Sequence, residues 1–345
     1  TFKERVAENF RGYSLSAGYN FQRKYLLDVN LGYNGSDRFA GSKRYGLFPA
    51  VSAGWNIAAE PFFEKLFPGI KLFKVRAGYG MVGSDAVDGN RYIYEQVYIP
   101  GGNYSFGETP GISNGIREGM LGNSNVTWEK KKSQNYALDV NMWNDKLSFT
   151  LEYFRDLRID QLVYRGSVPN VLGIGTAPVN IGRVQNKGWE LIATYQDKIG
   201  EVQFNITPTF SFAKNKVLYR DEAAQRYPWL AATGHPINQP FGYKFIGFYQ
   251  NDADIEKSAK PITGAVKPGD LKYADLNGDM LIDQNDMTAI GKPNLHTTNV
   301  GLTLGARYKG FSMNILFQGA YDYSFSIIGS GIEPFKSQFQ PIHLQ

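Results

Sequence analysis

At 345 residues the chain is long enough for one large or two ordinary domains, and its hydrophobic content of 42% argues against disorder over most of its length. It has no cysteine, which excludes disulfides, thiolate metal sites and a cysteine nucleophile. The formal net charge of +5 is spread along the chain without the basic block that nucleic-acid binding requires, so we expect no nucleic-acid partner.

The chain is rich in aromatic and turn-forming residues, with 38 glycines, 22 tyrosines and 23 phenylalanines, and its mean hydropathy is −0.35. No stretch of it approaches the roughly 18 consecutive apolar residues that a membrane helix needs. If such a chain spans a bilayer, it must therefore do so with strands.

Nonpolar and polar residues alternate in segments of about ten residues, the length that a tilted strand needs to cross the hydrocarbon layer. In the first segment, Tyr13, Leu15 and Ala17 alternate with serine and glycine. In the fourth segment, charge is confined to one face, which carries Lys74 and Arg76. Ten segments follow this pattern, at residues 13–21, 25–31, 51–57, 73–79, 136–142, 147–153, 189–195, 202–207, 302–308 and 311–317. Taken in pairs along the chain, they predict hairpins.

Two features favour a membrane barrel over a soluble antiparallel sandwich, which also has one nonpolar face per strand. The nonpolar rows begin or end with tyrosine or tryptophan, as an aromatic girdle at a lipid interface requires. Short turns also alternate with long loops, an asymmetry typical of outer-membrane barrels with tight periplasmic turns and long external loops. The predicted long loops are residues 34–46, 83–126, 163–186 and 218–297, and residues 61–69 form a longer turn on the short side.

We therefore predict an all-β protein, an antiparallel transmembrane β-barrel with long extracellular loops. Ten strands alone would enclose an interior largely filled by side chains. The inward rows are instead rich in serine, glycine, asparagine and threonine, which suit a wide lumen. We interpret residues 1–345 as part of a larger barrel domain, with residues 218–297 as its longest extracellular loop.

Six stretches resemble the SusC/RagA family of TonB-dependent transporters, and they occur in the family's order. They are residues 45–63 (YGLFPAVSAGWNIAAEPFF), 73–83 (FKVRAGYGMVG), 126–130 (VTWEK), 182–190 (GRVQNKGWE), 241–250 (FGYKFIGFYQ) and 268–291 (PGDLKYADLNGDMLIDQNDMTAIG). The resemblance implies a 22-stranded barrel in the bacterial outer membrane, surrounded by lipid and lipopolysaccharide. It also implies an N-terminal plug domain and the final strands, neither of which is found among these residues.

The same resemblance implies a function. The expected protein is an active importer of oligosaccharides or peptides that is energised by TonB through a part outside this sequence. Its expected partner is a SusD/RagB-like surface lipoprotein that acts as a lid, and it is not expected to be an enzyme. The alternatives are a passive porin or adhesin barrel, a TonB-dependent siderophore receptor, and a soluble sandwich lectin.

The most specific local motif, at residues 275–286, resembles a calcium-binding loop. Oxygen ligands at the spacing of an EF-hand or dockerin loop, with Leu281 contributing its backbone carbonyl, predict a structural Ca²⁺ that stiffens the long external loop. The predicted ligands are Asp275, Asn277, Asp279, Leu281, Asp283 and Asp286. The motif departs from the EF-hand at Met280, where glycine is expected, and at Asp286, where glutamate is expected. The alternative is a polar turn that binds nothing.

Aromatic residues in two predicted loops are candidates for substrate contact, because such rings stack on sugars or grip peptide side chains. They are Tyr92, Tyr94, Tyr98, Tyr104, Phe106, Tyr227 and Trp229. The alternative is that these rings pack the loops against each other or line the lid interface.

Two glycine motifs and the histidines do not support other chemistry. The G-x-G-x-x-G pattern at residues 78–83 is followed by a loop, whereas a dinucleotide site needs a helix N-terminus there. The G-x-S-x-G pattern at residues 111–115 has no strand-to-helix elbow around it. The histidines at 235, 296 and 343 are too scattered to predict a zinc site or a catalytic triad.

Overall fold

The computed structural model describes residues 8–87, 91–102, 104–106, 111–113 and 115–325. These residues form two compact units. The first contains the described residues up to Ile237 together with Asn299–Gly319, and the second contains Asn238–Thr298 together with residues 320–325. None of the helices in these ranges has the length and apolar character needed to cross a membrane.

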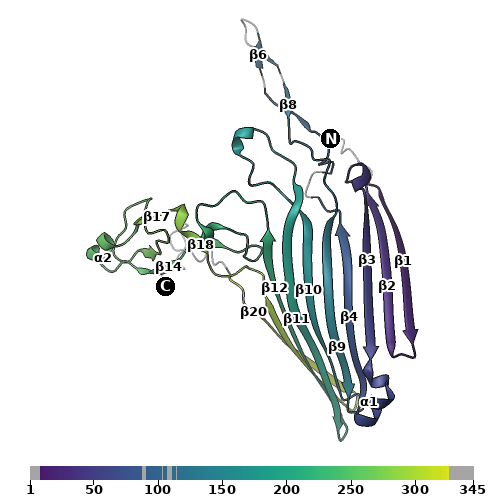
Figure 1. Ribbon diagram of the computed structural model, residues 1–345. Helices are drawn as coiled ribbons and strands as arrows, with labels where there is room; N and C mark the ends of the chain where they lie inside the picture. The colour runs from purple at the N-terminus through teal and green to yellow at the C-terminus, as the bar shows by residue number, and fades with distance from the viewer. Residues whose placement is uncertain (1–7, 88–90, 103, 107–110, 114, 326–345) are drawn as a thin grey trace. The chain divides into compact units, whose positions relative to one another are not determined.

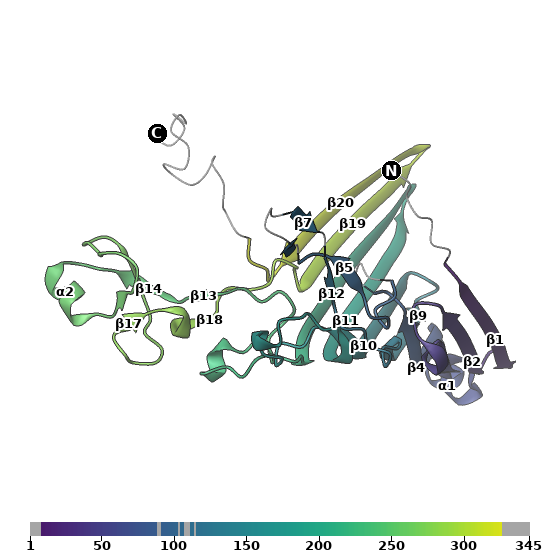
Figure 2. The ribbon, with the colours of Figure 1, turned by 90° about the horizontal axis from the view of Figure 1, so that it is seen from above.

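One antiparallel sheet of ten strands dominates the described residues (Figure 1). Its strands are β1 Phe10–Phe21, β2 Tyr25–Ser36, β3 Tyr45–Asn56, β4 Ile70–Ser84, β9 Glu129–Met142, β10 Leu147–Val163, β11 Val179–Ile199, β12 Val202–Tyr219, β19 Thr298–Tyr308 and β20 Phe311–Tyr321. They lie side by side in chain order, as one meander, and Figure 2 shows that they form a curved wall. The ten strands predicted from the alternation are confirmed.

The turns at one end of the sheet are tight because their residues adopt left-handed backbone angles. Gln22 and Arg23 have φ values of 53° and 58° between β1 and β2, and Trp143, Asn144 and Asp145 have values of 56°, 53° and 66° between β9 and β10. Successive residues with positive φ reverse the chain with the twist that antiparallel strands require. This local geometry fixes the register of the hairpins, in which Phe21 faces Tyr25 and Met142 faces Leu147.

Side-chain exposure alternates most clearly on β3, as the sequence pattern predicts. On β3, Leu47, Val51 and Trp55 are exposed, whereas every residue between Tyr45 and Asn56 on the opposite face is half-buried or buried. The register places Val51 between Val29 of β2 and Tyr79 of β4, so the exposed residues form a continuous nonpolar band across strands. The other sheets in the described residues have two strands each.

Aromatic rings border this band at both ends. Tyr25 and Trp55 are stacked with their ring centroids 6.5 Å apart at the end with the tight turns. Tyr33 and Tyr45 are stacked at 5.1 Å on the same strands at the other end. This is the arrangement of an aromatic girdle in a barrel whose nonpolar side faces lipid.

The strands are longer than the alternation alone predicted. β10 has 17 residues and β11 has 21, so the loop predicted at 163–186 is shorter and spans residues 164–178. A strand needs nonpolar alternation only where it crosses hydrocarbon, about ten residues. Beyond that depth the backbone pairing continues without the nonpolar pattern, so the sequence pattern does not reveal it.

The long loops carry short elements of their own. In the first unit these are η1 Gly41–Lys43, η3 Asn170–Leu172, η4 Pro228–Leu230, the paired strands β5 Tyr98–Pro100 and β8 Ile116–Glu118, and the paired strands β6 Tyr104–Phe106 and β7 Gly111–Ser113. At the end with the tight turns, η2 Ile57–Ala59 and α1 Pro61–Leu66 connect β3 to β4. The long turn predicted at 61–69 therefore contains a helix.

The second unit shows that most of the loop predicted at 218–297 is folded. Its strands are β13 Phe241–Tyr243 paired with β18 Met287–Ala289, β14 Phe245–Phe248 paired with β16 Leu271–Tyr273, and β15 Lys260–Pro261 paired with β17 Leu281–Ile282. Its helices are α2 Asp252–Lys257 and η5 Gln284–Asp286. Tyr249 is buried and donates its hydroxyl to the carbonyl of Ala259 at 2.6 Å, which ties the strands to the segment after α2.

The two faces of the sheet predict responses of different size to an introduced charge. Val29 lies on the nonpolar face of β2 midway between Tyr25 and Tyr33, and Asn30 lies on the polar face. We expect Val29→Arg to lower the free energy of unfolding by about 2–4 kcal/mol, the cost of arginine near the bilayer midplane. Asn30→Arg is the matched control and should have a much smaller effect. Urea unfolding of the lipid-reconstituted protein measures both, and equal losses would contradict the assignment of the faces.

Candidate functional site

The polar face of the sheet carries a network of charged side chains. Lys74 and Arg76 on β4 both reach Oδ2 of Asp139 on β9, at 3.2 Å from Nζ and 3.1 Å from Nε. Arg76 also contacts Glu152 on β10, with 3.0 Å between Nη2 and Oε2. Thr150 donates its hydroxyl to Asp139 at 3.0 Å. Ionised groups are very costly next to hydrocarbon, so this face must border water or polar protein.

A hollow of about 280 Å³ lies beside this network. Its polar lining comes from Asp28, Ser52, Lys74, Arg76 and Asn135, and glycines 54 and 78 leave room between these side chains. The hollow therefore combines cationic side chains with hydrogen-bonding groups. Such a surface can bind hydroxyl or carbonyl groups through several weak hydrogen bonds.

A nonpolar core fixes the bases of the long loops to the upper part of the sheet. Trp128 is buried, with ring centroids 5.5 Å from Phe39 and 5.2 Å from Phe48, and its indole N–H donates to the carbonyl of Arg44 at 2.9 Å. The full core is Phe39, Phe48, Ile93, Val126, Trp128 and Ala177. It joins four separate chain segments, which explains the physical role of the VTWEK stretch.

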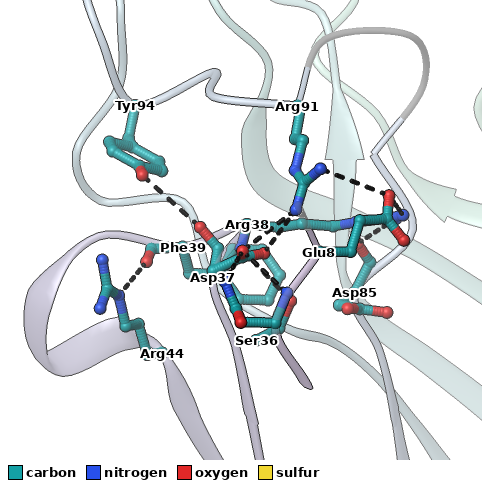
Figure 3. Close-up of polar contacts among 10 residues, drawn as sticks. Glu8, Ser36, Asp37, Arg38, Phe39, Arg44, Asp85, Arg91 and Tyr94 are labelled. Carbon is teal, nitrogen blue, oxygen red and sulfur yellow. Dashed lines mark hydrogen bonds and ion pairs between the residues drawn. The ribbon is translucent and has the colours of Figure 1, made fainter. Parts of the chain in front are cut away.

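An ion pair in the loops, Asp37 with Arg91, fastens the loop after β4 to the end of β2 (Figure 3). Nη2 of Arg91 lies 3.0 Å from Oδ2 of Asp37, and the backbone N–H of Asn9 donates to the same oxygen at 2.9 Å. Tyr94 donates its hydroxyl to the carbonyl of Asp37 at 3.5 Å. Arg38 donates to the carbonyl of Asp85 at 3.2 Å. Each of the two loops therefore donates a hydrogen bond from an arginine to the other.

These contacts alter the acidity of Asp37. Partial burial raises its pKa, but the backbone N–H of Asn9 and the guanidinium of Arg91 outweigh burial and hold the pKa below its ordinary value. Asp37 therefore stays charged well into the acid range.

The predicted aromatic contacts Tyr92 and Tyr94 lie at this ion pair. Their ring centroids are 5.8 Å apart in an edge-on contact, and the guanidinium of Arg91 lies 5.4 Å from the centre of the Tyr92 ring. Both tyrosines line an open hollow of about 670 Å³ that also includes Arg11, Arg44 and Glu95. Tyr98, on β5, is 63% exposed. The side chains of Tyr104 and Phe106 lie outside the part that the structure describes.

The other predicted aromatic pair lies in the loop after β12. Tyr227 and Trp229 are stacked, with ring centroids 4.6 Å apart and an interplanar angle of 7°. The carboxylate of Glu222 closes this loop by accepting hydrogen bonds from the backbone N–H of Ala232 at 2.9 Å and of Thr233 at 2.7 Å. Partial burial raises the pKa of Glu222, but a hydrogen bond from the hydroxyl of Thr233 and the two backbone hydrogen bonds outweigh burial and lower the pKa. The structure thus groups four of the seven aromatic candidates into two pairs in the loops, and the contact of any candidate with a substrate stays a prediction.

The predicted calcium ligands hold their own loop together. Asp275 accepts hydrogen bonds from the backbone N–H of Gly278 at 2.6 Å and of Met280 at 2.9 Å, and Asp279 accepts one from Leu281 at 2.9 Å. Met280 has a φ of 66°, the left-handed conformation that glycine would adopt more readily at this position.

The remaining predicted ligands cap a short helix. Asp283 and Asp286 form a capping box around η5, and the buried Asp286 also accepts a hydrogen bond from Leu276 at 2.8 Å. Over the ranges that the structure describes, histidine, aspartate and glutamate side chains form no group of three that could hold a metal ion. Asn277 hydrogen-bonds to Asp279 within the loop, and the calcium site stays a prediction.

Sequence reasoning did not find the Asp37–Arg91 pair or the partners of Arg76. Asp37 and Arg91 are 54 residues apart, and Arg76 and Glu152 are 76 apart, so neither pair has a local pattern. The one available signal is the confinement of Lys74 and Arg76 to the polar face of their strand, which implies carboxylates on the same face of neighbouring strands.

A sheet with a nonpolar outer band, a polar inner face and long loops at one end is the wall of a transmembrane β-barrel. Residues 5–309 match the family described as TonB dependent receptor-like, beta-barrel. The chain belongs to this family.

Named relatives agree with this assignment. The chain is 28% identical to the TonB-dependent receptor P39 of Formosa agariphila, over 87% of this chain and 31% of the relative. It is 26% identical to the TonB-dependent receptor SusC of Bacteroides thetaiotaomicron, over 90% of this chain and 30% of that protein. The resemblance to the SusC/RagA family predicted from the six stretches is confirmed.

Solved structures show the same fold. A chain of the RagAB peptide importer in its closed-closed state superposes with a TM-score of 0.71 at 18% identity, over 92% of this chain and 34% of that chain. The open-open state gives a TM-score of 0.72 at 17% identity, over 91% and 33%. The chain therefore spans about a third of the length of the relatives that it matches.

The Asp37–Arg91 pair predicts a pH-dependent loop. Because the folded-state pKa of Asp37 is below the ordinary value, the pair stabilises the loop fully above about pH 4 and loses its effect as pH falls through the lower folded-state pKa. We expect Asp37→Asn to speed hydrogen exchange in residues 91–95 several-fold at pH 7. Asp85→Asn is the control, because only the backbone carbonyl of Asp85 accepts from Arg38. Unchanged exchange in Asp37→Asn would contradict this role.

The calcium prediction is tested by titration calorimetry of Ca²⁺. Wild-type protein should bind, and Asp279→Ala should lose most of that binding because a carboxylate ligand is removed. Asp252→Ala removes an acidic residue of α2 outside the loop and should bind like wild type. Identical binding by the wild type and Asp279→Ala would end the calcium interpretation.

Proposed function

We propose that the chain forms part of the wall of an outer-membrane importer of oligosaccharides or peptides. The complete protein would be energised by TonB and would work with a SusD-like surface lipoprotein. No catalytic step is needed for this role. The proposal concerns the whole protein, of which this chain is about a third by comparison with its relatives.

The polar face of the sheet is the observation that carries this proposal. A soluble receptor would have no reason to place a nonpolar band outside and the Arg76, Asp139 and Glu152 network on the opposite face. A transport protein needs both, because its outer face must dissolve in lipid while its inner face admits a hydrated solute.

The long loops supply a capture surface of suitable chemistry. The hollow beside Tyr92 and Tyr94 combines aromatic rings with Arg11, Arg44 and Glu95. Rings that lie against polar and charged groups suit sugars, which have nonpolar ring faces and many hydroxyls. They also suit peptides, which have carbonyls, amides and charged ends. This mixed lining supports either substrate class.

The relatives support active import as the process. Several are named TonB-dependent receptors, one of them is SusC, and the RagAB importer is described as a peptide importer. Their plug and TonB-contacting parts would correspond to the two thirds of their length that this chain does not span.

Uptake by cells that carry the full-length gene tests the proposal. Fluorescent oligosaccharides and peptides would be supplied to cells with and without TonB, and we expect saturable uptake of one class that disappears without TonB. Unchanged uptake in the absence of TonB would instead identify a passive porin. Uptake of iron chelates alone would identify a siderophore receptor.

Two tyrosine variants sharpen this test. Tyr98 in the loops and Tyr19 on the nonpolar face of β1 are similarly exposed, at 63% and 61%. Tyr98→Ala should weaken substrate binding about fivefold, since an aromatic contact contributes about 1 kcal/mol. Tyr19→Ala should leave binding unchanged. A loss in Tyr19→Ala equal to that in Tyr98→Ala would show that the loops are not the capture surface.

A further inference from the structure

One connection at the tight-turn end of the sheet differs from its neighbours. Between β3 and β4 the chain forms η2 and the six-residue helix α1, whereas β1–β2, β9–β10 and β11–β12 are joined by a few residues each. Figure 1 shows α1 at the end of the sheet opposite the long loops. An insertion at this end has no role in capturing a substrate from outside.

The helix α1 is amphipathic. At about 100° per residue, Phe62, Phe63 and Leu66 lie within one arc of the helix, and Phe67 directly after it continues that arc. Glu64 and Lys65 fall on the other side. A helix this short does not hold its shape alone and depends on the surface on which it packs.

The surface on which α1 packs is the nonpolar face of the sheet. Phe63 is buried, with ring centroids 5.0 Å from Phe67 and 5.4 Å from Phe73. Phe73 is on β4, on the same face as Val75, whose partner across the strands is Trp55. The helix therefore lies on the side of the wall that faces away from the charged network.

The residue before α1 connects it to the aromatic girdle. Glu60 accepts hydrogen bonds from the hydroxyl of Tyr25 at 2.7 Å and from the indole N–H of Trp55 at 3.3 Å, and it pairs with Lys24 at 3.1 Å. One carboxylate thus fixes the start of the helix to the polar edges of two girdle rings. Such rings sit at the level of lipid headgroups.

The apolar side of α1 is only partly covered. Phe62 is 54% exposed, Leu66 is 68% exposed and Phe67 is 50% exposed. Leaving three large nonpolar side chains in water is unfavourable, and burying them in an apolar environment would be favourable. The helix meets the nonpolar face of the sheet through the contact of Phe63 with Phe73, and Phe67 also packs on Phe63.

We propose that α1 is an interfacial anchor that lies in the headgroup boundary of the periplasmic leaflet, with Phe62, Leu66 and Phe67 inserted among the upper acyl carbons. Continuity with the lipid-facing band selects phospholipid as the occupant. Lys65 is exposed on the other side of the helix and supplies a cation for lipid phosphates. The inference rests on the membrane placement in the proposed function, and it adds a fixed depth and tilt for this end of the wall.

A single fluorescent label tests the anchor directly. Because the chain has no cysteine, Leu66→Cys introduces one unique attachment point in it for an environment-sensitive nitrobenzoxadiazole dye. The full-length protein, with any cysteine outside this chain removed, would be reconstituted in phosphatidylethanolamine and phosphatidylglycerol vesicles, with and without doxyl-labelled acyl chains. We expect blue-shifted emission at residue 66 and at least twofold quenching by the doxyl lipid. Phe62→Cys provides an independent second position.

Two control positions separate failure of the anchor from failure of the membrane placement. Val51→Cys, in the middle of the nonpolar face of β3, should be quenched by the doxyl lipid, and Asn144→Cys, in the tight turn between β9 and β10, should be quenched by aqueous iodide. If residue 51 is quenched by lipid but residues 62 and 66 behave like residue 144, the anchor is wrong and the importer stands. If neither quencher reaches residues 62 and 66, protein covers the helix and the anchor is also wrong. If residue 51 is not quenched by lipid either, both proposals fall.

Discussion

Hydrocarbon cannot satisfy a polar group, and this constraint determines how the chain is built. Every backbone N–H and carbonyl at membrane depth must pair with a neighbouring strand, so the ten strands follow one another as a meander with tight turns at one end. Every side chain that points outward must be nonpolar, which sets the alternation seen most clearly on β3. The charged groups Lys74, Arg76, Asp139 and Glu152 are then possible only on the opposite face, where they neutralise each other across three strands.

Two glycines near the loop end of the sheet make room for the core beneath the loops. A Cβ atom on Gly83 would lie 2.1 Å from the ring of Phe48, and one on Gly46 would lie 2.5 Å from it, so the Phe48 ring occupies space that only glycine leaves free. Phe48 in turn packs against Trp128, which anchors segments from three loops. The loops are therefore positioned by their packing on the sheet. This packing also fixes the position of the aromatic pairs in the loops, such as Tyr92 with Tyr94.

The sequence predicts the wall well and the loop contacts poorly, for physical reasons. Alternation is a local property of each strand, so all ten strands could be predicted from it, but their extension beyond the membrane could not, because a strand in water needs no nonpolar face. The Asp37–Arg91 pair forms because two loops lie close together in the folded protein. No residue spacing in the sequence predicts that these loops are neighbours. Residues 61–69 were predicted only as a longer turn, since six residues are too few to show a helical period. Their place on the outer face becomes evident only from the contact of Phe63 with Phe73.

The central claim is that one face of each strand meets lipid while the other meets water, and reactivity of single cysteines along β3 measures this most directly. Ala50, Val51, Ser52 and Ala53 would be replaced by cysteine one at a time in the full-length protein, reconstituted in vesicles and treated with a charged maleimide. The structure predicts that positions 50 and 52 react, whereas positions 51 and 53 are protected. Reaction at all four positions, or protection of 50 and 52 with reaction at 51 and 53, would contradict it.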